Sequence, residues 1–114
     1  MKFTVKKVEA IYTGGGIFAY CGITEDGFHF IACDDPIRWV MLTESDTMTT
    51  ELSDTAWNDM WFEEWQNANA YYSTTTEAEA DRWLAVIYKA ILKDSSQSHF
   101  HSDMQKRLNT ITVY

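Results

Sequence analysis

Three turn signals divide the first 43 residues into four short apolar segments, and this pattern constrains the fold more than any other feature of the chain. The glycine triplet at 14–16 permits positive φ, Asp26-Gly27 favours a tight hairpin, and Pro36 removes an amide donor. Short turns of this kind join antiparallel strands, whereas parallel strands need a long crossover. We therefore predict a β-meander over residues 1–43. Its strands are expected at 2–13, 17–24, 28–33 and 37–43.

Apolar residues occupy both alternations of these predicted strands, and the phase slips by one at Lys6–Lys7, which predicts a β-bulge. Successive side chains of a strand point to opposite faces, so at least one face must meet helices. The other face is either covered as well or forms an exposed aromatic surface for a partner. One alternation carries Phe18, Tyr20, Phe28 and Phe30, and the other carries Ile17, Ala19, Ile23 and Ile31.

The second half of the chain has helical periodicity. A first helix is expected from Ser53 or Asp54 to about Ala70, because apolar residues recur there at i, i+4 and i+8. A second is expected over 77–93, after a capping box formed by Thr76 and Glu79, and a short third helix near 100–108. This helical part spans 53–108, and residues 109–114 form a closing strand or an extended tail.

These elements predict an α+β fold in one domain, 1–114. We expect an antiparallel sheet of four to five strands packed against two to three helices. The lysines near the N-terminus interrupt any signal-peptide pattern, and no segment has the apolar length of a membrane span. Cys21 and Cys33 lie in apolar segments and are expected as reduced core thiols, with a disulfide as the alternative. The chain is therefore predicted to be cytoplasmic.

Negative charge is concentrated in the middle of the chain. The sequence has 17 acidic and 9 basic residues, a formal net charge of −8. Residues 25–81 contain fourteen of the acids and one base, Arg38. Like charges repel one another, but the same field attracts a basic partner. This balance excludes a sequence-independent grip on nucleic acid, which requires many lysines and arginines.

The acidic block predicts a surface that binds a basic site on another protein. Asp59 and Glu63 lie one helical turn apart, about 6 Å along the axis, while each DNA strand carries a charge about every 3.4 Å. Carboxylates in this arrangement can stand in for phosphates, as in a DNA mimic. The alternative is that the acids only maintain solubility. The predicted partner-binding residues are Asp34, Asp35, Asp54, Asp59, Glu63 and Glu64, with Phe62 as an aromatic anchor.

The sequence predicts no catalytic residue, metal or cofactor. It contains neither a G-x-S-x-G motif nor a P-loop. His99 and His101 would point to different sides of a helix, and the Asp34–Asp35 loop is expected to be solvated. A small hydrolase or metal-dependent enzyme would need a pocket that gathers His29 and one of the two cysteines with carboxylates.

The opening stretch 11–35, IYTGGGIFAYCGITEDGFHFIACDD, resembles the start of small, acidic, uncharacterised accessory proteins of bacterial phages, plasmids and conjugative elements. Some accessory proteins of this size resemble anti-restriction or anti-CRISPR inhibitors. The resemblance implies an inhibitory binding protein, and it transfers no functional residue. We therefore predict a non-enzymatic protein that docks on a basic protein such as a nucleic-acid-binding nuclease. The alternative is a structural module that forms a homodimer through the aromatic sheet face.

Overall fold

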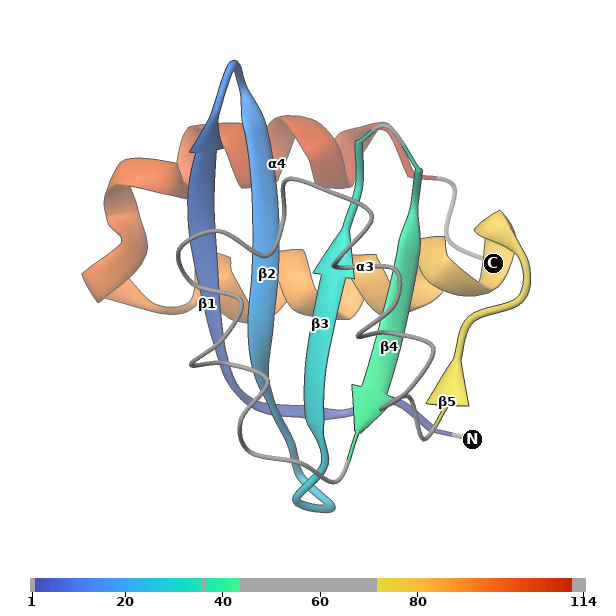
Figure 1. The fold of residues 1–114 in the computed structure, drawn as a ribbon. Coiled ribbons are helices and arrows are strands. Elements are labelled where there is room, and N and C mark those ends of the chain that lie inside the picture. Colours follow the sequence, from blue (N-terminus) through green and yellow to red (C-terminus); the bar gives the residue numbers. More distant parts are fainter. Residues whose placement is uncertain (1, 36, 44–71, 112–114) are drawn as a thin grey trace.

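The computed structural model describes residues 2–35, 37–43 and 72–111 (Figure 1). Within them, five antiparallel strands form one sheet in the order of the sequence, which confirms the predicted α+β class. The possible fifth strand was predicted at 109–114, whereas the observed one lies at 72–73, where two residues are too short to show a periodicity. The strands are β1 (Val5–Gly14), β2 (Ile17–Thr24), β3 (His29–Cys33), β4 (Trp39–Thr43) and β5 (Tyr72–Ser73).

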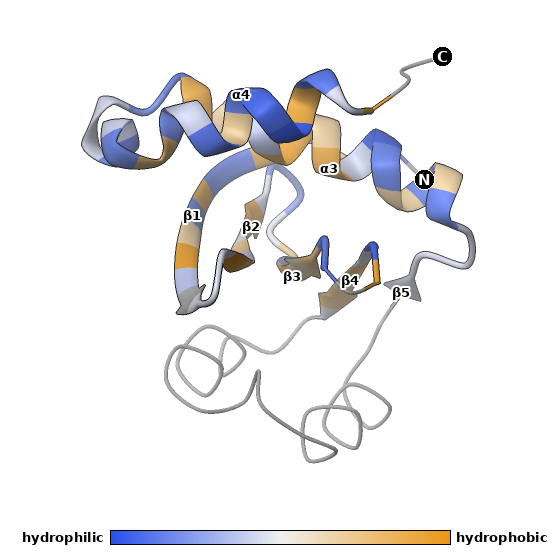
Figure 2. Cartoon of the chain, turned by 90° about the horizontal axis from the view of Figure 1, so that it is seen from above, coloured by the Kyte–Doolittle hydropathy of each residue, from blue (hydrophilic) through white to orange (hydrophobic). Residues whose placement is uncertain are grey.

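The helices of the described residues lie in one layer on one side of this sheet (Figure 2). They are α3 (Glu77–Leu92), the 3-10 helix η2 (Ser95–Phe100) and α4 (His101–Asn109). α3 begins as predicted, since Oγ1 of Thr76 accepts a hydrogen bond from the Glu79 amide at 3.2 Å. No helix of the described part of the chain is long and apolar enough to cross a membrane.

The structure does not test the helix predicted at 53–70, and it corrects the prediction for the C-terminal residues. The helix expected over 53–70 lies outside the described residues. The C-terminal strand is not formed at 109–111, where α4 ends and a turn follows, and residues 112–114 lie outside the described part. The Thr110 amide donates to the carbonyl of Arg107, so a helical hydrogen-bond pattern overrides the alternating sequence.

The main core lies between the sheet and the helices. The aromatic alternation of the strands faces this layer, where the predicted stripe of α3 covers it. The Phe3 ring stacks on Trp83 with centroids 4.6 Å apart and meets the Phe30 edge at 5.3 Å. The aromatic alternation is thus interior. Its buried members and those of the stripe are Phe18, Tyr20, Phe30, Ala80, Trp83, Leu84, Ile87 and Ile91.

The centre of the opposite sheet face is buried as well. Ile31 and Met41 belong to this alternation and are 0% exposed. Cys21 and Cys33 share it, and both are buried with free thiols, as expected for core cysteines. Of the two alternatives predicted for this face, a covered or an open surface, its centre is therefore covered.

The β1–β2 hairpin contains the predicted irregularity. Its register slips between Val5 and Lys7, so a bulge forms where the apolar phase shifts. At the other end of β1, Gly15 and Gly16 have φ of 62° and 79°, which a residue with a side chain rarely adopts. These features set the alternation of the longest strand pair in the sheet.

The turns at the two ends of the sheet separate the acids of the meander. The pairing of His29 with Thr43 places the 25–27 turn at the end where β4 stops. The Asp34–Asp35 loop lies at the opposite end, beyond the five residues of β3. Five strand residues span about 16 Å. The acids of the two turns therefore do not form one cluster.

Candidate functional site

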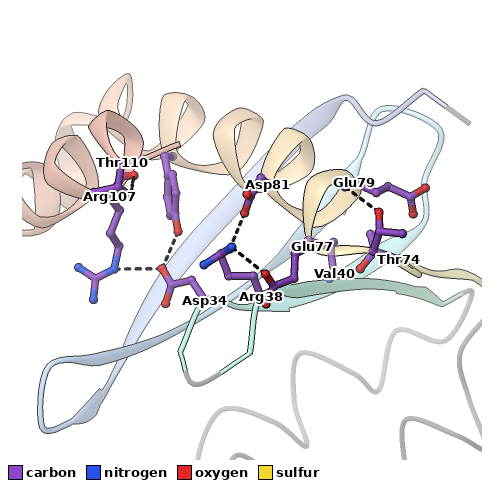
Figure 3. A network of polar contacts seen from close by, with 11 residues as sticks. Asp34, Arg38, Val40, Thr74, Glu77, Glu79, Asp81, Arg107 and Thr110 are labelled. Carbon is purple, nitrogen blue, oxygen red and sulfur yellow. Dashed lines mark hydrogen bonds and ion pairs between the residues drawn. The ribbon is translucent and has the colours of Figure 1, made fainter. Parts of the chain in front are cut away.

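Asp34 is the centre of a polar cluster that joins four elements of the fold (Figure 3). Its Oδ2 accepts hydrogen bonds from the hydroxyl of Tyr20 on β2 at 2.7 Å and of Tyr88 on α3 at 2.6 Å. The Nε of Arg107, on α4, donates to the same oxygen at 3.0 Å. The Asp34 side chain is 6% exposed. The cluster thus places one buried carboxylate and two buried phenols beside a guanidinium whose side chain is 24% exposed.

Arg107 extends this cluster to the β1–β2 turn. Its Nη2 donates to the carbonyl of Gly16 at 2.9 Å, and its guanidinium carbon lies 4.8 Å from the centroid of the Phe18 ring. A guanidinium makes a fork of hydrogen bonds and stacks on an aromatic face at the same time, which an ammonium cannot do. One residue of α4 therefore binds a loop, a turn and the core.

The prediction of a solvated Asp34–Asp35 loop is wrong for Asp34, whereas Asp35 is exposed. A buried carboxylate is stable only when it is paired and hydrogen-bonded, and here distant elements supply both kinds of partner. The Asp34 side chain is buried and its charge is balanced by Arg107, so it does not contribute to an exposed acidic surface. Of this predicted pair, only Asp35 presents its carboxylate to solvent.

The environment of the cluster keeps both phenols neutral. Burial, followed by the negative charge of Asp34, raises the pKa of Tyr20 and of Tyr88 far above the usual value of 10.0. Both side chains remain hydrogen-bond donors to Asp34 at physiological pH. Sequence analysis missed these donors because nothing in their local patterns distinguishes them from other core aromatics.

A cleft of about 290 Å³ lies beside the cluster. Its two arginines both have carboxylate partners. Arg107 pairs with Asp34, while Arg38 contacts Glu77 at 3.0 Å and approaches Asp81 at 2.6 Å, the latter without the angle of a hydrogen bond. Both arginine charges in the cleft are therefore balanced by carboxylates. The lining residues are Asp34, Asp35, Arg38, Tyr88, Arg107, Thr110 and Ile111.

A second hollow, about 430 Å³ in volume, lies on the sheet face away from the helices. It gathers residue types that the enzymatic alternative requires: Lys7 and Glu9 of β1, Cys21 of β2 and His29 of β3. Burial and the charge of Glu9 raise the pKa of the Cys21 thiol to about 11. The thiol is therefore protonated at neutral pH and is a poor nucleophile.

The imidazole of His29 does not activate that thiol through Nδ1, because this atom is buried without a hydrogen-bond partner. Among residues 2–35, 37–43 and 72–111, no three His, Cys, Asp or Glu side chains are grouped so that they could hold a metal ion. The hollow therefore brings polar groups together without the nucleophile–base hydrogen bond that covalent catalysis uses.

The remaining predicted site residues are Asp54, Asp59, Phe62, Glu63 and Glu64, and they lie outside the described residues. Their sequence context is distinctive, since residues 44–71 include seven acids and no base. The sheet fixes both ends of this connection at one place. The chain leaves β4 after Thr43 and returns at Tyr72, whose Cα partner on β4 is Leu42.

Comparison of the chain with family models, with curated proteins and with solved structures finds no match.

Proposed function

We propose that this protein is a non-enzymatic binding protein that docks on a basic site of another protein, with the carboxylates of residues 44–71 in place of nucleic-acid phosphates. The observation that supports the proposal is the position of the excess negative charge in the sequence. Outside residues 44–71 the chain has ten acids and nine bases and is almost neutral. The net negative charge of the protein therefore belongs almost entirely to one connection.

The contacts within the fold support this division of charge. Four acids at or near the helix layer have internal partners. Asp34 pairs with Arg107, Glu77 and Asp81 pair with Arg38, and Glu79 accepts from the hydroxyl of Tyr72 at 2.9 Å. The three acids paired with arginines therefore have their fields partly cancelled at a distance, and the hydrogen bond to Glu79 connects β5 to α3.

The topology fixes both ends of the acidic connection at one place. Because Thr43 and Tyr72 lie on adjacent paired strands, the chain leaves and rejoins the sheet at the same corner. The exposed acids Glu25 and Asp26 lie at that same end of the sheet. Acidic residues concentrated on one part of a protein accelerate its association with a cationic surface and make that association sensitive to salt.

Recovery of a partner from a bacterial lysate tests the proposal. The immobilised protein is washed at low salt and eluted with a salt gradient, and the eluted proteins are identified by mass spectrometry. We expect a lysine- and arginine-rich nucleic-acid-binding protein that elutes at moderate salt and is displaced by a short DNA duplex. Absence of any partner at low salt would contradict the proposal.

Two charge reversals of equal size provide the matched comparison. Asp59→Lys with Glu63→Lys should abolish partner recovery and leave the circular dichroism unchanged. Glu9→Lys with Asp103→Lys alters the net charge equally, on β1 and α4, and should retain the partner. Equal loss in both variants would indicate a general charge effect, and full retention by the first would place the interface elsewhere.

A further inference from the structure

The outer edge of β1 is closed by one side chain. β1 is the first strand of the sheet, so its far side has no neighbouring strand within the described sheet. Oε1 of Gln97 accepts from the Ala10 amide at 2.8 Å, and Nε2 donates to the Val8 carbonyl at 2.9 Å. This pair of hydrogen bonds is what a neighbouring strand would make with β1, so the Gln97 amide imitates a strand residue.

Burial and a further hydrogen bond hold the Gln97 side chain in this position. It is 7% exposed, and its second amide hydrogen is bonded to Oδ2 of Asp94 at 3.0 Å. Its backbone departs from helical geometry, with φ −111° and ψ 23°, inside η2. The polar break predicted from Asp94 to Ser98 is therefore a short helix that directs one amide at the sheet edge.

Open space flanks the Gln97 side chain along that edge. Two open hollows of about 240 and 340 Å³ border β1 beside η2 and the end of α3. Both touch Lys7 and Val8, and Asp94 lines both as well, so Asp94 and the Gln97 side chain bonded to it lie between two openings along the strand. An added strand would replace its two hydrogen bonds and gain further ones along β1.

We propose that the β1 edge is a latent self-association surface, which Gln97 holds closed, and that the strand it accepts is β1 of a second copy. The side-chain order selects the register. In an antiparallel pair centred on Val8, exposed Lys7 lies opposite Glu9 of the other copy, twice by symmetry. A pair centred on Glu9 would instead place like charges opposite each other. This surface is distinct from the acidic connection and does not depend on the proposed function.

Gln97→Met tests the proposal, because methionine keeps the length of the side chain and removes both hydrogen bonds. We expect the wild type to remain monomeric in light scattering as concentration rises, whereas the variant doubles its mass. Hydrogen exchange should show the Ala10 amide protected at all concentrations in the wild type and only at high concentration in Gln97→Met. A variant that folds but stays monomeric, or one unfolded at every concentration, would overturn the proposal.

Charge variants in the Gln97→Met background distinguish this pairing from general aggregation. Glu9→Lys places lysine opposite lysine and should abolish the dimer. Adding Lys7→Glu restores opposite charges in the same register and should restore it. An association that ignores both changes would overturn the β1 pairing, because misfolded chains do not depend on this register.

Discussion

Arg107 on the last helix donates a hydrogen bond to Asp34, which lies 73 residues earlier in the loop between β3 and β4. The donor also binds the carbonyl of Gly16, and the acceptor also binds Tyr20 and Tyr88. This pair therefore attaches α4 to the sheet through polar contacts at a site where the carboxylate is almost fully buried. Removing this pair should therefore lower the free energy of unfolding of the whole domain, rather than alter one surface alone.

Replacing Arg107 by alanine should lower the free energy of unfolding by about 3 kcal/mol, because a buried carboxylate loses its charge partner. Arg107→Lys should recover only part of this, since lysine lacks the planar fork. Urea denaturation measures both effects. As a control, Arg38→Ala removes two more exposed ion pairs, to Glu77 and Asp81, and should cost about 1 kcal/mol or less for each. Equal losses at the two arginines would argue against a special role for the buried pair.

Stability should decline steeply in alkali. The native pKa values of Tyr20 and Tyr88 are raised, so their contribution is complete below pH 10 and is lost as pH rises above it. Each of the two should cost about 1.4 kcal/mol per pH unit above 10, because only the unfolded chain ionises. Urea denaturation at pH values from about 9 to about 11, which bracket the usual phenol pKa, measures the slope of the free energy of unfolding against pH. In Tyr20→Phe the slope above pH 10 should fall by about 1.4 kcal/mol per pH unit, since Tyr88 and the two buried thiols still contribute, and an unchanged slope would refute the assignment.

The two thiols should be unreactive in the folded protein. Burial, aided by Glu9, raises the pKa of Cys21 to about 11, and burial also raises that of Cys33. At pH near 8 the reaction of Cys21 with iodoacetamide should be slower by about 100-fold or more than in guanidinium. Glu9→Gln should accelerate modification of Cys21 and leave Cys33 unchanged, as peptide mass spectrometry can show. Rapid alkylation of the native protein would contradict the burial of these side chains.

Gly22 should tolerate no side chain. A Cβ at this position would overlap the Lys7 carbonyl and lie 2.7 Å from Cζ of Phe30. Gly22→Ala is therefore expected to lower the free energy of unfolding by about 3 kcal/mol through overpacking. Gly15→Ala is the control, since a Cβ there meets nothing within 4 Å and costs only the strain of a left-handed φ, about 1 kcal/mol. Thermal unfolding that ranks Gly15→Ala as the worse change would disprove this steric reason.

Acid should weaken the turn that positions Gln97. Hydrogen bonds from Ser96 and then Gln97 lower the pKa of Asp94 below its usual 3.8. A lowered native pKa means that the contribution is present above 3.8 and is lost as pH falls through the native value. Asp94→Asn should therefore reduce stability at neutral pH and flatten its decline in acid. If the two proteins lose stability in parallel as pH falls, Asp94 is not the group responsible.

Local patterns predicted a large part of the fold. The glycine triplet, the Asp26-Gly27 turn and the Lys6–Lys7 phase slip identified the hairpins and the bulge. Thr76 identified the start of α3. Each of these signals acts within a few residues of backbone, where dihedral preferences and hydrogen bonds are decided by near neighbours.

The candidate site was less predictable. Sequence analysis marked Asp34 and Asp35 as one solvated acidic loop, and the fold separated them into a buried and an exposed carboxylate. It treated Gln97 as part of a polar break, whereas that side chain completes the edge of β1. In both cases the decisive partners lie many residues away, so no local window contains them.

The order of residues alone determined where the charge lies, because counting acids and bases needs no geometry. It also determined the alternation of the strands and the apolar stripe of α3, since these periods follow from backbone repeats. Only the tertiary structure decided which polar groups are buried and what satisfies them. These outcomes depend on elements that meet after folding, as when Arg107 balances the charge of Asp34, whose side chain is 6% exposed.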